Sequence, residues 1–242
     1  YINEQNQDES AYLKPASSYV EEVIKHFHDR QELGINRSPW SKCLSKFNLR
    51  PAEVTCWLGY NGHGKSLILG QVANHLMEIG EKVCIASMEM RPYATMARMC
   101  RQAFGVTSPT IELIRGYHTW TDNRLWIYDQ SGSTPARRVI NLCHYAASIG
   151  IKHIIIDSLM KVVAKEDDYN GQKEFVDGLC VMARDTGMHV HLVHHSRKRE
   201  DENKRPGKMD AKGSGAISDL VDNCISVFRV KSGTSDFGDY DC

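Results

Sequence analysis

The chain has 242 residues, 41% of them hydrophobic and 25% charged, a length that suits one large α/β domain or one domain with an appended segment. No apolar run is long enough to cross a bilayer, and the formal net charge of zero means that any contact with nucleic acid must be local. The eight cysteines occur singly without a C-x-x-C pair, which argues against zinc and for a reducing compartment.

The N-terminal region is expected to be separate from the main domain. The chain starts with Tyr1 and carries no signal peptide, so we expect a piece of a longer protein. Residues 1–16 are polar and expected to be loose, whereas residues 17–33 read as an amphipathic helix. Its apolar stripe consists of Tyr19, Val20, Val23, Ile24 and Phe27. This helix packs either on its own domain, the reading we favour, or as an arm on a neighbouring subunit. We divide the chain into a polar segment with a linker helix, 1–34, and a main domain, 35–242.

Residues 59–66 fit the pattern G-x-x-x-x-G-K-[ST] at every fixed position. The apolar run 54–58 precedes them and the helix-prone run 67–79 follows, the strand–loop–helix setting of a phosphate-binding loop. A glycine-rich loop alone is often only a turn. Here its glycines let backbone N–H groups curl around a phosphate chain, and the helix adds its positive N-terminal end. Lys65 is predicted to reach the β- and γ-phosphates and Ser66 to hold Mg²⁺. The predicted nucleotide-binding residues are Asn61, Gly62, His63, Gly64, Lys65, Ser66 and Leu67.

Two acids follow apolar strands. Glu89 comes after the strand 83–87, which we expect to be adjacent to the P-loop strand; facing the γ-phosphate, it would polarise the attacking water as a general base. Its other reading is an acid that stabilises the start of the next helix. Asp157 ends the strand 153–157 and is predicted to order the Mg²⁺ shell, although an acid there can also merely cap a helix.

Four histidines lie on or just after the strand 189–193. His189 and His191 share one face, but no cysteine or acid joins them, so a structural metal is not expected. His195 lies at the carboxyl end of the strand, level with the nucleotide. It is predicted to sense the γ-phosphate and to pass its state onward.

The next segment, 196–212, is a long polar loop with seven basic and four acidic residues. Such a charge run is often only solvated surface. Its position after His195 also suits a mobile loop that grips a phosphate backbone, and without interleaved aromatic residues it would not read bases. The predicted DNA-binding residues are Arg197, Lys198, Lys204, Arg205, Lys208, Lys212, Gly213, Ser214 and Gly215.

Strands and helices alternate from Val54 onward, which predicts an α/β fold with a mostly parallel twisted sheet covered by helices on both faces. Ligands of such sheets bind at the carboxyl ends of the strands. The predicted strands are 54–58, 83–87, 124–128, 153–157, 189–193 and 224–229. The predicted helices are 65–79, 91–104, 135–149, 172–187 and 213–221.

These motifs together resemble, in order, those of hexameric replicative DNA helicases of superfamily 4. The segments that carry the likeness are 59–66, 87–90, 156–158, 194–198 and 210–217. The likeness is to the RecA-like P-loop NTPase motor of bacterial replicative helicases, phage primase-helicases and the mitochondrial helicase Twinkle, and it spans roughly residues 35–230.

The resemblance implies a ring of six subunits that binds ATP (or another NTP) and Mg²⁺ between neighbours, translocates 5′–3′ along single-stranded DNA and separates strands. It implies primase and replisome proteins as partners, no membrane, and a cytoplasmic location, or the mitochondrial matrix for a Twinkle-like protein.

It also assigns roles to single residues. Lys65, Glu89 and His195 would serve hydrolysis, with His195 at a phosphate-sensing position that is His in the phage type and Gln in the bacterial type. Ser66 and Asp157 would order the metal. The segment 197–212 matches a central-channel DNA loop, 213–215 the turn that closes it, and 161–172 a second pore-facing loop.

The sequence departs from the family near its end. Replicative helicases carry an arginine finger in a Lys-x-Arg pair on a late strand, and nothing after Val230 has that spacing; Arg229-Val230-Lys231 has the reverse order and comes too early. We therefore expect the chain to be truncated before that strand, and we find no primase or N-terminal collar domain. Two alternatives stay open: a RecA-type recombinase, and a regulatory ATPase of the same fold that does not act on DNA.

Overall fold

The computed structural model describes residues 14–28, 37–43, 47–130, 132–163, 168–196 and 217–230, and only the backbone of residues 25 and 26. The chain divides into two compact units, residues 1–36 and 37–242, and each is described by itself. The domain boundary that we placed after residue 34 stays a prediction.

The first unit contains a 3₁₀ turn, Ala16–Tyr19, and the helix α1, Val20–His28. Its apolar stripe is largely exposed, from 46% at Tyr19 to 67% at Phe27. Packing of this helix on its own domain, the reading that we favoured, and packing on a neighbouring subunit both stay predictions.

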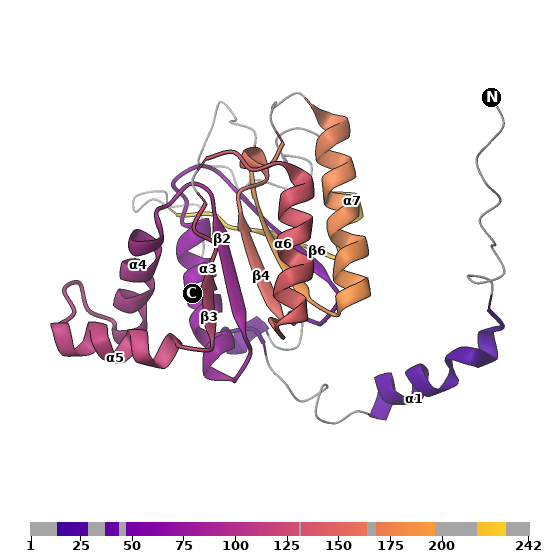
Figure 1. Cartoon of the computed structure of the whole chain (residues 1–242), viewed down its shortest axis with the longest axis horizontal. Coiled ribbons are helices and arrows are strands. Elements are labelled where there is room, and N and C mark those ends of the chain that lie inside the picture. The colour runs from indigo at the N-terminus through magenta and orange to yellow at the C-terminus, as the bar shows by residue number, and fades with distance from the viewer. Residues whose placement is uncertain are drawn as a thin grey trace. The chain divides into compact units, whose positions relative to one another are not determined.

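The second unit is built on one six-stranded sheet in which every pairing is parallel, in the order β3-β2-β4-β5-β1-β6 (Figure 1). The strands are β1 (Val54–Gly59), β2 (Val83–Ser87), β3 (Leu125–Ile127), β4 (His153–Asp157), β5 (His189–His195) and β6 (Asn223–Ser226). The helices are α3 (Lys65–Glu78), α4 (Pro92–Phe104), α5 (Ile111–Thr121), α6 (Ala136–Ser148), α7 (Tyr169–Thr186) and α8 (Ile217–Leu220), and the 3₁₀ turns are Ser41–Cys43 and η4 (Leu159–Lys161).

Alternate residues of the central strands feed two hydrophobic cores, one on each face of the sheet. Ile154 and Ile156 belong to the core with α6 and α7, whereas Ile155 belongs to the core with α3, α4 and α5. Figure 1 shows α6 and α7 side by side along the sheet. Strands that are apolar on both faces need helices on both faces, so the predicted α/β fold class is confirmed.

Several element boundaries differ from the predictions. Strand β5 continues to His195, and α7 begins already at Tyr169. Helix α5 was not predicted, although the threonine at position 110 was a local signal for the start of a helix. In the structure its side chain accepts a hydrogen bond from the Leu113 N–H at 3.4 Å, as an N-cap residue does. No helix in the described part of the chain is long and apolar enough to span a membrane.

The sheet order corrects one spatial expectation. Strand β2, which precedes Glu89, is not adjacent to β1, because β4 and β5 lie between them. Glu89 must therefore extend over the carboxyl end of β4 to approach the P-loop.

Candidate nucleotide and magnesium site

The P-loop follows β1 directly, at the carboxyl edge of the sheet. Gly62 and Gly64 have φ values of +78° and +93°, which side chains rarely adopt, and a Cβ on either would meet open space. Glycine is therefore required by the backbone path, and among the described residues no atom outside the adjacent residues lies within 4 Å of a Cβ built at either position. Gly64 precedes α3 and its carbonyl accepts the N–H of Leu67 at 2.9 Å, so the helix starts at Lys65 with its N-terminus at the loop.

Lys65 is folded into the loop. Its Nζ donates to the carbonyl oxygens of Gly59 and Tyr60, both at 2.9 Å, and the residue is only 5% exposed. Burial lowers the pKa of Lys65, while the carboxylates of Asp157 and Glu89 oppose that shift. A desolvated ammonium beside open space is a strong attractor for phosphate.

Ser66 and Asp157 meet across the carboxyl edge: the Ser66 hydroxyl donates to Asp157 Oδ2 at 2.6 Å. Burial raises the pKa of Asp157, the Ser66 hydrogen bond lowers it, and the charge of Glu89 adds to the rise. A small cavity of about 30 Å³ adjoins the pair, with Ser87 and Arg98 in its lining. It has room for a water molecule.

The oxygen atoms of Ser66 and Asp157 are suitable ligands for Mg²⁺. A hydroxyl and a carboxylate are hard oxygen ligands, and Mg²⁺ bound with a nucleotide takes one or two protein ligands and completes its shell with phosphate oxygens and water. In the described residues no group of three or more histidine, cysteine or acidic side chains could hold a metal alone, so the pair would depend on the nucleotide for the remaining ligands.

Glu89 lies between two polar partners. Its Oε1 accepts a hydrogen bond from the Ser158 hydroxyl at 2.8 Å and lies 3.5 Å from His195 Nε2. The hydrogen bond from His195 is the main cause that lowers the pKa of Glu89 to about 2, against the opposing effect of burial, and Ser158 adds to the lowering. The carboxyl is therefore ionised at neutral pH and can orient a water by accepting its proton in a hydrogen bond.

His195 connects this carboxylate to the P-loop strand. It pairs in register with Gly59, and the N–H of Ser196 donates to the Gly59 carbonyl oxygen at 3.0 Å. His195 thus lies beside the start of the P-loop while its ring faces Glu89. Residue 197, the first of the predicted DNA loop, follows two positions later.

The geometry agrees with comparisons to known proteins. A model of the AAA domain family matches residues 32–201, well over half of the chain. The chain belongs to the AAA domain family.

Two solved structures share the fold of this AAA domain. One is described as an ATPase domain, and it matches with a TM-score of 0.72 and 16% identity, over 88% of this chain and 82% of that one. The other is a DnaB-like replicative helicase, described together with its interactions with primase. It matches with a TM-score of 0.69 and 16% identity, over 88% of this chain and 56% of that one. At this identity the likeness shows the fold alone, and it confirms the predicted RecA-like motor fold.

The AAA domain brings the predicted catalytic and metal-binding residues together at the carboxyl edge of the sheet: Lys65, Ser66, Glu89, Asp157 and His195. The other predicted phosphate-contacting residues lie on the P-loop or in the first turn of α3: Asn61, Gly62, His63, Gly64 and Leu67.

The predicted DNA-binding residues lie outside the described part of the chain: Arg197, Lys198, Lys204, Arg205, Lys208, Lys212, Gly213, Ser214 and Gly215. Of the predicted second pore-facing loop, 161–172, the structure describes Lys161 at the end of η4 and the start of α7, but not residues 164–167.

The sequence did not reveal two contacts of this site. The sequence motifs predict no role for Ser158, although its position directly after Asp157 was an available signal. The contact of His63 with Phe228 had no signal, since 165 residues separate the two rings, whose centroids lie 5.4 Å apart.

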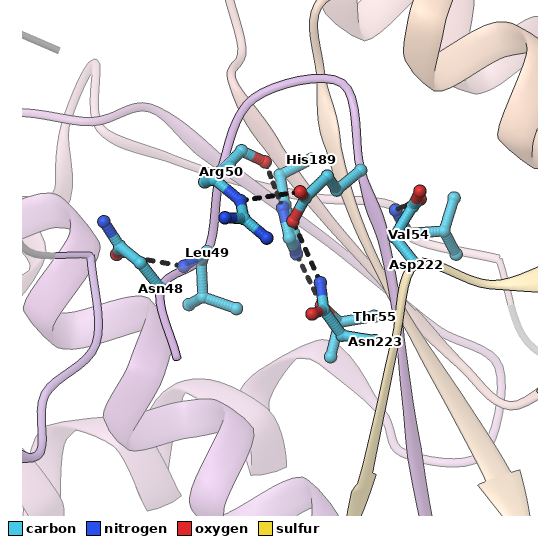
Figure 2. Close-up of polar contacts among 9 residues, drawn as sticks. Asn48, Leu49, Arg50, Val54, Thr55, His189, Asp222 and Asn223 are labelled. Carbon is cyan, nitrogen blue, oxygen red and sulfur yellow. Dashed lines mark hydrogen bonds and ion pairs between the residues drawn. The ribbon is translucent and has the colours of Figure 1, made fainter. Parts of the chain in front are cut away.

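Three buried histidines, His153, His189 and His191, form a network outside the nucleotide site. His189 lies between the Thr55 hydroxyl, 2.9 Å from its Nε2, and the carbonyl oxygen of Arg50 at its Nδ1 (Figure 2). A carbonyl only accepts, so Nδ1 carries the proton and Nε2 accepts from Thr55. His191 accepts from Trp57 Nε1 at 3.3 Å on its Nδ1. Its Nε2 therefore carries the proton, and this atom lies 3.2 Å from Nδ1 of His153, a partner that the sequence did not suggest.

Proposed function

We propose that this chain is an ATP-driven helicase motor that translocates on single-stranded DNA and separates strands, working as a ring of six subunits with Mg²⁺. The observation that carries the proposal is the pair of contacts that Glu89 makes with Ser158 and His195. These contacts join the ends of β4, β2 and β5, and the basic segment starts at residue 197, two positions after His195. A DNA loop that starts so close to the nucleotide site can respond to hydrolysis.

In this proposal the P-loop N–H groups and Lys65 bind the phosphates. The Lys65 ammonium has three N–H donors and gives two of them to carbonyl oxygens, so the third can bond a phosphate oxygen. Ser66 and Asp157 would hold Mg²⁺, which supplies charge stabilisation at the phosphates. Lys65 and the metal pair therefore fix the phosphate chain at the carboxyl edge of the sheet.

Glu89 orients the attacking water and takes up its proton. A pKa of about 2 makes it a weak base without nucleotide. Bound phosphates are like charges and raise the pKa of a nearby carboxyl, so nucleotide binding itself would make Glu89 a better base. His195, which touches the same carboxylate, is placed to sense whether the γ-phosphate is present.

Assembly into a ring is supported by the first unit. The exposed stripe of α1 is an apolar surface that a second copy of the chain could cover. A primase is a candidate partner, because the DnaB-like helicase is described as interacting with primase. We expect translocation in the 5′–3′ direction, as in the replicative helicases that the motifs resemble.

The decisive experiment measures ATP hydrolysis with and without single-stranded DNA and images the particles by electron microscopy. We expect DNA to stimulate turnover and the particles to be rings. Forked duplexes with a single 5′ or 3′ tail then test direction, and we expect unwinding only with the 5′ tail. Filaments would indicate a recombinase, and ATPase activity indifferent to DNA would indicate a regulatory ATPase.

A further inference from the structure

The P-loop contacts a chain segment that lies far away in the sequence. The backbone N–H of Arg229 donates a hydrogen bond to Nδ1 of His63 at 3.2 Å, across a separation of 166 residues. Phe228 lies against the same histidine, with ring centroids 5.4 Å apart. We call Tyr60, His63, Phe228 and the Arg229 N–H the P-loop clasp.

Three aromatic rings make up the apolar part of the clasp. Tyr60 meets His63 edge to face at a centroid distance of 5.2 Å, and its ring also lies 6.5 Å from that of Phe228. Tyr60 is 3% exposed, so the rings fix one side of the loop while its outer residues face solvent. Edge-to-face and tilted arrangements are the favourable geometries of such rings.

The hydrogen bond fixes the tautomer of His63. A backbone N–H can only donate, so Nδ1 of His63 accepts and carries no proton. The proton of the neutral ring therefore lies on Nε2.

The base of the loop is held against the same segment. The N–H of Val227 donates to the Leu58 carbonyl oxygen at 2.7 Å. At the next residue of β1, a Cβ on Gly59 would collide with the carbonyl oxygen of Val227. The glycine that begins the P-loop motif is thus also required for close packing against the segment after β6. The P-loop is consequently held at both Gly59 and His63.

We propose that the P-loop clasp holds the loop in its phosphate-binding shape, with His63 as a positioning residue and Phe228 as its support. This inference rests on the proposed nucleotide site. A loop that binds phosphate through backbone N–H groups must have one defined backbone path, and a loop ordered before binding loses less conformational entropy on binding. The clasp also makes nucleotide affinity depend on the segment that follows β6.

The first test is independent of nucleotide. The ¹⁵N chemical shifts of the His63 ring in the whole chain report which nitrogen carries the proton. We expect an unprotonated Nδ1 and a protonated Nε2 at neutral pH. A protonated Nδ1 in the neutral ring would overturn the clasp.

The second test measures the affinity for a fluorescent ATP analogue together with KM and kcat. His63→Leu removes the acceptor and should weaken affinity about three- to tenfold, the effect of one hydrogen bond, and KM should rise with it. His63→Asn keeps an acceptor near the position of Nδ1 and should recover most of that loss. Phe228→Leu should weaken affinity as His63→Leu does. The control is Tyr145→Leu, which removes an aromatic ring that is 64% exposed on α6.

The outcomes separate the clasp from the site. Unchanged affinity in His63→Leu, or an Asn variant as weak as the Leu variant, would overturn the clasp while the nucleotide site stands. No binding of the analogue by the wild-type chain would overturn the proposed function and with it the positioning role. Circular dichroism of each variant confirms that the fold is retained.

Discussion

At the scale of single residues, the candidate site depends on side chains that hydrogen bonds within the protein orient. Lys65 is buried against its own loop and Asp157 already pairs with Ser66. These hydrogen bonds hold Lys65 and the Ser66–Asp157 pair in a socket that would receive phosphate and Mg²⁺. Two substitutions distinguish binding from chemistry at this socket.

Lys65→Ala should abolish turnover and weaken ATP affinity by about 10- to 100-fold, because a hydrogen bond to a charged group is lost from a desolvated site. Isothermal titration with ATP and Mg²⁺ measures the affinity. Lys152→Ala removes an exposed lysine before β4 and is the matched control. Turnover by Lys65→Ala at the wild-type rate would contradict the site assignment.

Glu89→Gln should lower hydrolysis by about 10²-fold or more, since the amide has the size of the acid but cannot take a proton. ATP affinity should stay similar, as Glu89 contacts Ser158 and His195 rather than the P-loop. Steady-state turnover and titration of ATP into the variant give the two quantities. Glu112→Gln on α5 is an exposed control. If Glu89→Gln hydrolyses ATP normally, the residue only stabilises the start of α4, and the base lies elsewhere.

At the scale of elements, two segments carry the proposed work beyond the ATP site: the helix α1 and the basic loop after β5. Both were predicted from the sequence by their residue patterns. Their predictions concern assembly and DNA binding.

If the α1 stripe packs on a neighbouring subunit rather than on its own domain, it contributes to assembly. Replacing Val23 and Ile24, which are 50% and 47% exposed, by Ser should shift the oligomer towards monomers, because each buried aliphatic side chain is worth about 1.5–3 kcal/mol. Light scattering coupled to size exclusion measures the mass. Glu22→Ser, on the polar side of the same helix, should leave assembly intact. An unchanged mass in the double variant would remove α1 from the interface.

The basic loop is predicted to bind single-stranded DNA with an affinity that falls as the salt concentration rises. Neutralising Arg197, Lys198, Lys204 and Arg205 should weaken binding of single-stranded DNA with little sequence dependence. It should also reduce the salt slope by about 0.7 per lost phosphate contact. Basal ATPase should survive while its stimulation by DNA falls. Fluorescence anisotropy at several salt concentrations gives both quantities.

The matched control for the loop neutralises four exposed basic residues on other surfaces: Arg101, Arg115, Lys152 and Arg184. It has the same change in charge, so it separates a local grip from a general electrostatic effect. Equal loss of DNA affinity in the two quadruple variants would return the loop to the solvated-surface reading.

At the scale of the whole molecule, the buried histidines should make stability depend on pH. Burial lowers the pKa of His189 from 6.5 to about 4, and the pKa values of His153 and His191 lie well below their usual range for the same reason. Between pH 6.5 and about pH 4 the unfolded chain binds more protons than the folded one, because the buried histidines stay neutral in the folded chain. Stability is therefore fully present above about pH 6.5 and is lost as the pH falls towards 4.

Urea unfolding at pH 7 and pH 5 tests this dependence, with each pKa unit worth about 1.4 kcal/mol. We expect a lower midpoint at pH 5. His189→Asn removes one titrating group and should flatten the dependence, although the variant is less stable at both pH values. His144→Asn, an exposed residue on α6, should leave the dependence as in the wild type. A midpoint equal at the two pH values would show that the network is protonated in the folded state.

The sequence by itself determined the α/β class, the P-loop, and the acids and histidine at strand ends. Each of these depends on local order: an apolar run, then a glycine-rich loop or a polar residue, then a helix. Because parallel strands end at one edge, placing Lys65, Glu89, Asp157 and His195 at that edge required no knowledge of strand order.

Only the tertiary structure decided the strand order, and with it that β4 and β5 separate the strand that precedes Glu89 from the P-loop strand. It alone brought Phe228 and Arg229 to His63, and His153 to His191. These contacts join residues far apart in the chain, and their geometry follows from sheet register and side-chain packing. No local pattern in one sequence encodes that register, because each strand carries the same apolar signal whichever neighbour it finally pairs with.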